Sequence, residues 1–247
     1  MTVDVATLPK LGLIVPPAAG KVPDDGPLLY GERAQFMARG LALTEMSSAG
    51  YEAVIDSVAD RAKSLAQAGA KVISLMGTSL SFYRGAAFNR RLSAAIFDAT
   101  GLPATTMSSA VIRALQASGV RRVAVATAYI DDVNHRLVSF LREEGIEVTA
   151  IKGLAMTDVI GVGNVTPEIL SALAREVFAE DRSAEGVLIS CGGLRTLDIL
   201  DPLETALQIP VISSSPAGFW DVVQLADIDP TVPSFGRLFQ QSGRMVG

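Results

Sequence analysis

The chain has 247 residues, of which 49% are hydrophobic and 19% charged, and its net charge is −5 at pH 7. This length suffices for one large domain or two small lobes with a real core, and the composition excludes a disordered chain. The negative charge argues against a general nucleic-acid binder, which needs a basic surface to neutralise phosphates.

Short apolar runs alternate with longer amphipathic segments along the chain. We expect strands at 11–15, 71–76, 121–127, 146–151, 186–190 and 209–213. We expect helices at 49–68, 108–118, 132–144, 166–178 and 216–226. Runs that are apolar on both faces are typical of buried parallel strands, and their alternation with helices indicates βαβ units.

Three further local features are expected. Thr166 followed by Pro167 predicts a helix start, with Thr166 as the cap. The stretch 161–165 before it is expected to be a loop. A helix over 194–207 is poorly defined, because Pro202 interrupts it.

The chain contains a weak internal repeat. The stretch ISLMGTSL (73–80) can be laid over VLISCGGL (187–194), which places Gly77 opposite Cys191. In the same way LGLIVPPA (11–18) matches RVAVATAY (122–129). Two similar lobes that face each other would bring four strand ends to one cleft.

Ligands of open α/β sheets bind beyond the carboxyl ends of the strands. The segments that follow the predicted strands are therefore expected to line the cleft. They are Pro16-Pro17, Gly77-Thr78-Ser79, Thr127-Ala128-Tyr129 and Cys191-Gly192-Gly193, with Ser213–Gly218 at a fifth strand end.

Several chemistries have no support in this sequence. A metal site needs several His, Cys or carboxylate ligands, whereas the chain has one His and one Cys, 56 positions apart. His135 lies among charged residues and is expected to be an exposed helical side chain. The dinucleotide, P-loop and GxSxG nucleophile motifs are all absent from the sequence.

Cys191 is the only cysteine, and it lies where a predicted strand ends. A free cysteine is commonly a buried small hydrophobe. Ser190 precedes this thiol and two glycines follow it, which indicates a turn and leaves a chemical role open. Two roles are also compatible with Thr78 and Ser79, because they could bind an anion or simply cap a helix. Tyr129 could be a packing aromatic.

One cysteine cannot form an internal disulfide, which fits a reducing compartment. The N-terminus, MTVDVATLPK, lacks the basic start and apolar run of a signal peptide, and no apolar stretch approaches the ~20 residues that span a bilayer. We expect a soluble, cytoplasmic protein.

Five stretches carry a resemblance to a known family. They are IVPPAAG (14–20), LMGTSLSFYRGAAFN (75–89), ATAYIDDVN (126–134), SCGGL (190–194) and SSSPAGFWD (213–221). On these stretches the chain resembles the arylmalonate decarboxylase family of the aspartate/glutamate racemase superfamily, from about Leu11 to Phe239. The resemblance implies two pseudo-symmetric α/β/α lobes with parallel four-stranded sheets and an active site in the cleft between them. We place the first lobe at 1–107 plus 215–247 and the second at 108–214.

The resemblance also implies a reaction. Racemases of the superfamily carry one cysteine in each lobe, whereas this chain has Gly77 where the first would stand. A single thiol can deliver a proton to one face of a carbanion. The implied function is decarboxylation of α-aryl (α-methyl) malonates to enantiopure 2-arylpropionate-type acids, of the (R) hand, through an enediolate that Cys191 protonates.

The resemblance assigns the remaining site residues. An oxyanion hole would comprise Gly77, Thr78, Ser79, Tyr129 and Gly192. A hydrophobic pocket would comprise Pro16, Pro17, Leu43, Met46, Leu80, Val159, Val162 and Gly193. Met46 and Val162 stand where other apolar residues are expected, which leaves the size of the pocket open.

No cofactor and no metal are expected. The expected partner is a small-molecule dicarboxylate substrate, with no nucleic acid and no membrane, and we expect a monomer. Two alternatives stay open: an isomerase or racemase of the same superfamily, such as a maleate isomerase, and a non-catalytic small-acid binding protein.

Overall fold

The fold consists of two lobes, each built on a four-stranded parallel sheet. The computed structural model describes residues 7–240; residues 1–6 and 241–247, at the two ends of the predicted first lobe, lie outside the described residues. The first sheet is formed by β1 (Lys10–Val15), β2 (Gln35–Gly40), β3 (Val72–Leu75) and β4 (Ala104–Thr106). The second sheet is formed by β5 (Arg122–Thr127), β6 (Glu147–Gly153), β7 (Gly186–Ser190) and β8 (Val211–Ser213).

The two sheets repeat the same strand order. The first runs β2-β1-β3-β4 and the second β6-β5-β7-β8. Strands β1 and β5 therefore occupy equivalent positions, and so do β3 and β7. These are the pairs that the internal repeat aligns, so the predicted class of two pseudo-symmetric α/β lobes is confirmed. The predicted lobe boundaries at 107 and 215 stay a prediction.

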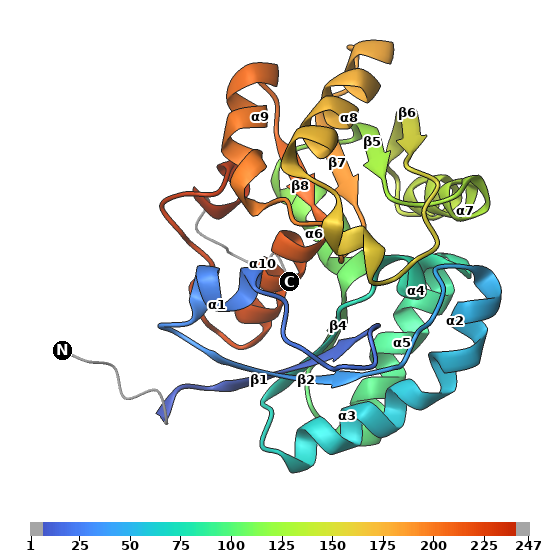
Figure 1. Ribbon diagram of the computed structural model, residues 1–247. Helices are drawn as coiled ribbons and strands as arrows, with labels where there is room; N and C mark the ends of the chain where they lie inside the picture. The colour runs from blue at the N-terminus through green and yellow to red at the C-terminus, as the bar shows by residue number, and fades with distance from the viewer. Residues whose placement is uncertain (1–6, 241–247) are drawn as a thin grey trace.

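Helices surround and connect the sheets (Figure 1). They are α1 (Asp25–Tyr30), α2 (Ser48–Val54), α3 (Val58–Gln67), α4 (Thr78–Phe82), α5 (Gly85–Thr100), α6 (Met107–Ala117), α7 (Asp131–Glu143), α8 (Pro167–Glu180), α9 (Leu200–Leu207) and α10 (Ser214–Leu225). In Figure 1 α6 and α10 lie between the two sheets, and they pack against each other and against β4 and β8. These two helices join the lobes.

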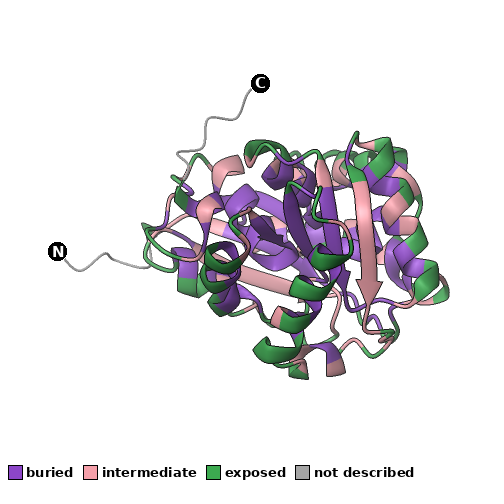
Figure 2. Ribbon diagram, turned by 90° about the horizontal axis from the view of Figure 1, so that it is seen from above, coloured by how far each residue is buried: buried purple, intermediate pink, exposed green. Residues whose placement is uncertain are grey.

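The core follows the apolar runs of the sequence. Every residue of β3 and β7 is buried, and the exposed residues gather on the outer helices (Figure 2). Each fully buried Val, Leu or Ile side chain contributes about 1.5–3 kcal/mol through removal of apolar surface from water. No helix in the part of the chain that the structure describes is long and apolar enough to cross a membrane.

Several local predictions need correction. The predicted helix 49–68 is divided into α2 and α3 by the 3₁₀ turn η2 (Ile55–Ser57), and the predicted loop at 161–165 contains a 3₁₀ turn, η3 (Gly161–Asn164). Pro202 lies in the first turn of α9, where a missing N–H costs no helical hydrogen bond, so a helix does form there. The start of α8 is confirmed, because the Thr166 side chain accepts a hydrogen bond from the N–H of Ile169.

Candidate active site

The first half of the site is the turn that follows β3. Gly77 is the N-cap of α4 and has extended backbone angles. Neither the hydroxyl of Thr78 nor that of Ser79 caps this helix, so the capping interpretation is wrong. The N–H groups of Thr78, Ser79 and Leu80 stand in the first turn, where no earlier carbonyl can accept them, and the structure gives them no other acceptor among the described residues. Three adjacent N–H groups are thus available to an anion.

The second half of the site is the turn that follows β7. Cys191 is the first residue beyond the strand, and its side chain is 5% exposed. Its carbonyl accepts a hydrogen bond of 3.2 Å from the N–H of Leu194, which closes the turn. Burial raises the pKa of the Cys191 thiol to about 11, against a smaller lowering by the N–H of Gly193 and the hydroxyl of Tyr129. The thiol is therefore protonated at neutral pH.

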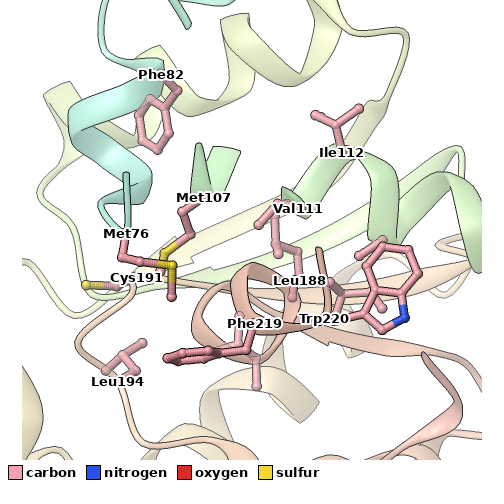
Figure 3. Close-up of a cluster of buried hydrophobic side chains, with 14 of the residues drawn as sticks. Met76, Phe82, Met107, Val111, Ile112, Leu188, Cys191, Leu194, Phe219 and Trp220 are labelled. Carbon is pink, nitrogen blue, oxygen red and sulfur yellow. The ribbon is translucent and has the colours of Figure 1, made fainter. Parts of the chain in front are cut away.

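One methionine contacts both halves. The hydroxyl of Thr78 donates a hydrogen bond of 3.0 Å to Sδ of Met107. A β-carbon on Gly192 would lie only 2.8 Å from the same sulfur atom, so Met107 fills the space that this glycine leaves. Figure 3 shows Met76, Met107 and Cys191 grouped together, with Leu194 and Phe219 beside them. The two turns that the sequence aligns therefore meet in space.

Tyr129 joins the site from the end of β5. It is buried, and the hydroxyl of Ser190 donates to its phenolic oxygen at 3.4 Å. Its ring also packs edge-on against Phe82, with 5.9 Å between the centroids. Burial raises the pKa of Tyr129 well above its usual value, and the nearby Cys191 thiol raises it further. The phenol stays protonated, so it can donate a hydrogen bond as well as pack.

Tyr51 is a site residue that the sequence analysis missed. It is buried on α2, and its hydroxyl forms no hydrogen bond with any atom that the structure describes. Burial raises its pKa, while the Ser79 hydroxyl nearby lowers it and Cys191 raises it. The Tyr51 phenol is thus protonated and lies near Ser79 and Cys191, where it can donate a hydrogen bond to a bound anion. The predicted helix 49–68 includes Tyr51, but helical periodicity alone does not show that this side chain reaches the site.

The apolar residues of the predicted pocket lie around these polar groups. A β-carbon on Gly77 would lie 3.1 Å from Cγ of Pro16 and 3.3 Å from Cβ of Leu80. Sγ of Cys191 lies 3.9 Å from Sδ of Met46, and a β-carbon on Gly193 would lie 3.2 Å from Cγ1 of Val162. These contacts bring together six of the eight predicted pocket residues, with Leu43 tied to Pro16 by a hydrogen bond of 2.9 Å from its N–H to the Pro16 carbonyl. No individual side-chain contact places Pro17 or Val159 in the pocket.

Two loops from opposite lobes contact each other beside the predicted pocket residues. Glu45, after β2, forms an isolated antiparallel bridge with Asp158, after β6. The N–H of Met46 donates to the carbonyl of Thr157 at 2.9 Å. Val159, half-buried, and Val162, buried, follow this bridge on the second-lobe loop.

Other parts of the described chain offer no competing site of the same quality. A surface hollow lies at the opposite ends of the second-lobe strands and is lined by Gln116, Arg121, Glu144 and Glu185, among others. No group of three or more His, Cys, Asp or Glu side chains suited to a metal ion is found among residues 7–240. His135 is exposed on α7, as expected.

Comparison with known proteins gives matches along nearly the whole chain. The family model described as "Arylmalonate decarboxylase" matches residues 11–239. Arylmalonate decarboxylase of Bordetella bronchiseptica is 53% identical over 238 residues, which cover 96% of this chain and 99% of that protein. Maleate isomerase of Nocardia farcinica is 25% identical over 94% of this chain and 96% of its own length.

Solved structures agree with these matches. A liganded mutant of arylmalonate decarboxylase, in which one glycine is changed to cysteine and one cysteine to serine, superposes with a TM-score of 0.93. It is 52% identical and covers 95% of this chain and 100% of its own. The maleate isomerase Iso of Pseudomonas putida S16 has a TM-score of 0.86 at 22% identity, covers 94% of this chain and 98% of its own, and shares the fold. The chain belongs to the arylmalonate decarboxylase family, and it is an enzyme of the carboxy-lyase class.

Proposed function

We propose that this protein decarboxylates α-aryl malonates, with or without an α-methyl group, and protonates the product on one face. The observation that carries the proposal is a single buried, protonated thiol at Cys191 opposite the three free N–H groups of Thr78, Ser79 and Leu80. The name of the relative from Bordetella bronchiseptica supports the same substrate class.

The first half of the site binds the carboxylate that the product keeps. The N–H groups of the α4 start and the phenols of Tyr51 and Tyr129 donate to its two oxygens. Loss of carbon dioxide from the other carboxylate leaves an electron pair that delocalises onto these oxygens and forms an enediolate. Donors aimed at oxygens where charge grows lower the barrier, by about 2.7–4 kcal/mol for one such donor.

The apolar residues receive the carboxylate that is lost and the aryl group. Leu43, Met46, Leu80, Val159 and Val162 offer a carboxylate no hydrogen-bond donor from their side chains. Charge on that group is poorly solvated there and disappears as carbon dioxide leaves. The aryl ring lies against Pro16, Pro17 and Gly193 and delocalises part of the developing negative charge.

Cys191 completes the reaction. Its S–H bond breaks as the proton moves to the α-carbon, and the bonding electrons stay on sulfur as a thiolate. A thiol with a pKa of about 11 is a strong base once deprotonated, so water returns its proton and resets the site. One thiol reaches one face, and the product is a single enantiomer.

The test uses purified protein with phenylmalonate and with methyl(phenyl)malonate, in the presence of EDTA and without added cofactor. We expect release of carbon dioxide from both and a single enantiomer of 2-phenylpropionate from the second. Racemic product would contradict protonation by one thiol. If neither substrate reacts while maleate is converted to fumarate, the isomerase alternative replaces the decarboxylase.

A further inference from the structure

Two buried serines lie directly behind the N–H groups that bind the carboxylate. Ser81 is on α4 and Ser108 is in the first turn of α6, and neither has any exposed surface. The hydroxyl of Ser81 lies 2.9 Å from the carbonyl oxygens of Gly77 and of Thr78. The hydroxyl of Ser108 lies 2.9 Å from the carbonyl oxygen of Thr78.

The two serines also bind each other. Their hydroxyl oxygens are 2.7 Å apart, and the N–H of Ser108 donates to the hydroxyl oxygen of Ser81 at 3.3 Å. Each hydroxyl has one proton to donate. When Ser108 donates to the Thr78 carbonyl, Ser81 donates to Ser108; when Ser108 donates to Ser81, Ser81 donates to the Gly77 or the Thr78 carbonyl. The bond from Ser81 to Gly77 is a local one, of a kind that serines often make within a helix. The bond from Ser108 to Thr78 joins two helices.

Because a peptide group is planar, the hydrogen bonds to these carbonyls also orient the N–H groups of the site. In a trans peptide the C=O of one residue and the N–H of the next point in opposite directions. The Gly77 carbonyl shares its plane with the N–H of Thr78, and the Thr78 carbonyl shares its plane with the N–H of Ser79. Hydrogen bonds to these two carbonyls, which include the N–H of Ser81 on the Gly77 carbonyl at 3.1 Å, therefore fix the directions of both N–H groups, away from the serines.

Helix α4 needs such support, because it has only five residues. A single turn fixes several backbone dihedral angles for very few hydrogen bonds, so a helix of this length is unstable by itself. Its neighbour Met107 already holds the Thr78 hydroxyl at 3.0 Å. The start of α6 thus holds Thr78 by both its side chain and its carbonyl.

We propose that Ser81 and Ser108 are positioning residues that fix the peptide groups on both sides of Thr78, so that the N–H groups of Thr78 and Ser79 converge on the substrate carboxylate. This inference rests on the proposed function of the same turn. It adds two residues that touch no substrate atom and act only through the backbone.

The variants are Ser81→Ala, Ser108→Ala and the double variant, with Ser109→Ala as the matched control. Ser109 is the next residue on α6, but its hydroxyl oxygen accepts from Asn89 at 2.8 Å and from Thr106 at 3.0 Å, and it contacts neither carbonyl. We expect kcat for phenylmalonate to fall about 3-fold in each single variant, because each loses one of the hydroxyls that hold the carbonyls. In the double variant we expect a fall of more than 10-fold, because each serine can still serve Thr78 when the other is missing. KM should change less than kcat, since the donors act most strongly on the enediolate.

A second pair of variants separates the hydroxyl from packing. Ser108→Thr and Ser108→Val differ only in a hydroxyl against a methyl group. We expect the threonine variant to keep most of the activity that the valine variant loses, at similar melting temperatures. Equal activities of the two variants would overturn the proposal, as would a loss in Ser109→Ala as large as that in Ser108→Ala.

A crystal structure of the Ser81→Ala/Ser108→Ala variant, or of Ser81→Ala/Ser108→Val if that variant does not fold, tests the inference without any turnover. We expect the Thr78–Ser79 peptide group to be rotated or to occupy more than one orientation. An unchanged peptide group overturns the proposal whatever the substrate is. Wild-type protein that fails to decarboxylate phenylmalonate contradicts the proposed function instead, so the two failures are distinguishable.

Discussion

The strand ends after β3 and after β7 occupy the same position in two sheets of the same order, yet they are built for different tasks. After β3 the chain enters α4 directly, so the three N–H groups of the first helical turn have no acceptor within the helix. After β7 no helix begins until the 3₁₀ turn η4 (Leu197–Ile199), and the first residue beyond the strand is the buried thiol. One end can stabilise negative charge and the other can supply a proton.

The difference between Gly77 and Cys191 shows how a symmetric fold can perform a reaction with one handedness. Two thiols in equivalent positions could exchange protons across both faces of a carbon atom. In the proposed reaction, the glycine at one position leaves only one face of the carbanion to receive a proton, and the space at the other is left for the substrate carboxylate. The following predictions alter one strand end at a time, starting with the largest expected effect.

Cys191→Ser should abolish most of the turnover while leaving substrate binding intact. A serine hydroxyl is a far weaker acid than a thiol, and a positioned general acid contributes about 10²–10⁴-fold to a rate. We expect kcat for methyl(phenyl)malonate to fall in that range, measured by carbon dioxide release. Calorimetry should show that the variant binds the substrate with little change in Kd. Unaltered turnover would refute the proton-donor role.

Tyr51→Phe should lower kcat by about 10-fold or more, toward the 10²-fold loss seen for a single oxyanion-hole donor. Tyr83→Phe is the matched control, because the Tyr83 hydroxyl is also buried without a hydrogen-bond partner among the described atoms, and the two rings lie 5.2 Å apart. Both variants should have similar melting temperatures. If the two lose activity equally, Tyr51 acts through packing and donates nothing to the substrate.

Gly77→Cys should reduce decarboxylation and introduce slow racemisation of 2-phenylpropionate. A β-carbon at this position meets Pro16 and Leu80 at 3.1 and 3.3 Å, so it fits with small shifts, and the backbone there is one that any residue adopts. The new thiol would face Cys191 across the α-carbon. Gly77→Ala has the same β-carbon without a thiol and should racemise nothing. Chiral chromatography of 2-phenylpropionate measures racemisation by both variants. If Gly77→Cys does not racemise it, the two positions do not face one carbon atom.

The pH profile of kcat/KM should extend to unusually alkaline pH. The pKa of Cys191 is about 11, raised by burial from an ordinary value near 9, so at pH 9 only about 1% of the thiol is ionised. Activity depends on the protonated form, which is present below this pKa and lost as pH rises through it. We expect kcat/KM to fall as pH rises through about 11. The negative charge of a bound substrate raises the pKa of the thiol further, so kcat should fall at a still higher pH. A fall in kcat/KM near pH 8.5, or fast alkylation of Cys191 by iodoacetamide at pH 8, would show that burial does not raise the pKa of this thiol.

The same raised pKa predicts a small change in stability. Because the folded state disfavours the thiolate, the free energy of unfolding should fall as pH rises from about 9, where the unfolded thiol ionises, to about 11. The loss is at most about 3 kcal/mol for a shift of this size. Urea denaturation at pH 8 and pH 10.5 measures it, with Cys191→Ser as the reference protein. An equal pH dependence in both proteins would show that the shift does not come from this thiol.

Much of the fold was predictable from local patterns. The runs that became β1, β3, β5 and β7 are central in their sheets and apolar on both faces, which is why their order and their internal repeat were visible. The edge strand β2 was missed because it contains Gln35 and Arg39 and is only half-buried. Strand β4 was missed because three residues carry too little periodicity, and α5 because it begins at a glycine.

The site was predictable in part for the same reason. Gly77, Thr78, Ser79, Tyr129, Cys191 and Gly192 follow central strands, and the structure brings them together. Tyr51 was missed because it lies within a helix, in the predicted range 49–68, and not directly after a strand. The interpretation of Thr78 and Ser79 as helix caps was wrong, because Gly77 occupies the cap position. Gly77 has no side chain to accept a hydrogen bond, so the N–H groups of the first turn stay free.

The sequence by itself determined the two lobes, the strand ends that carry polar residues, and the solitary thiol opposite a glycine, because each follows from local periodicity and composition. Only the tertiary structure decided which groups are protonated and which donors are free. The pKa of Cys191 depends on burial by residues from both lobes, and the hydroxyl of Tyr51 is unpaired because of where α2 packs. The carbonyl of Thr78 accepts a hydrogen bond from Ser108, a serine on another helix. These properties arise from contacts between segments that lie far apart in the chain, and no local pattern of residues encodes them.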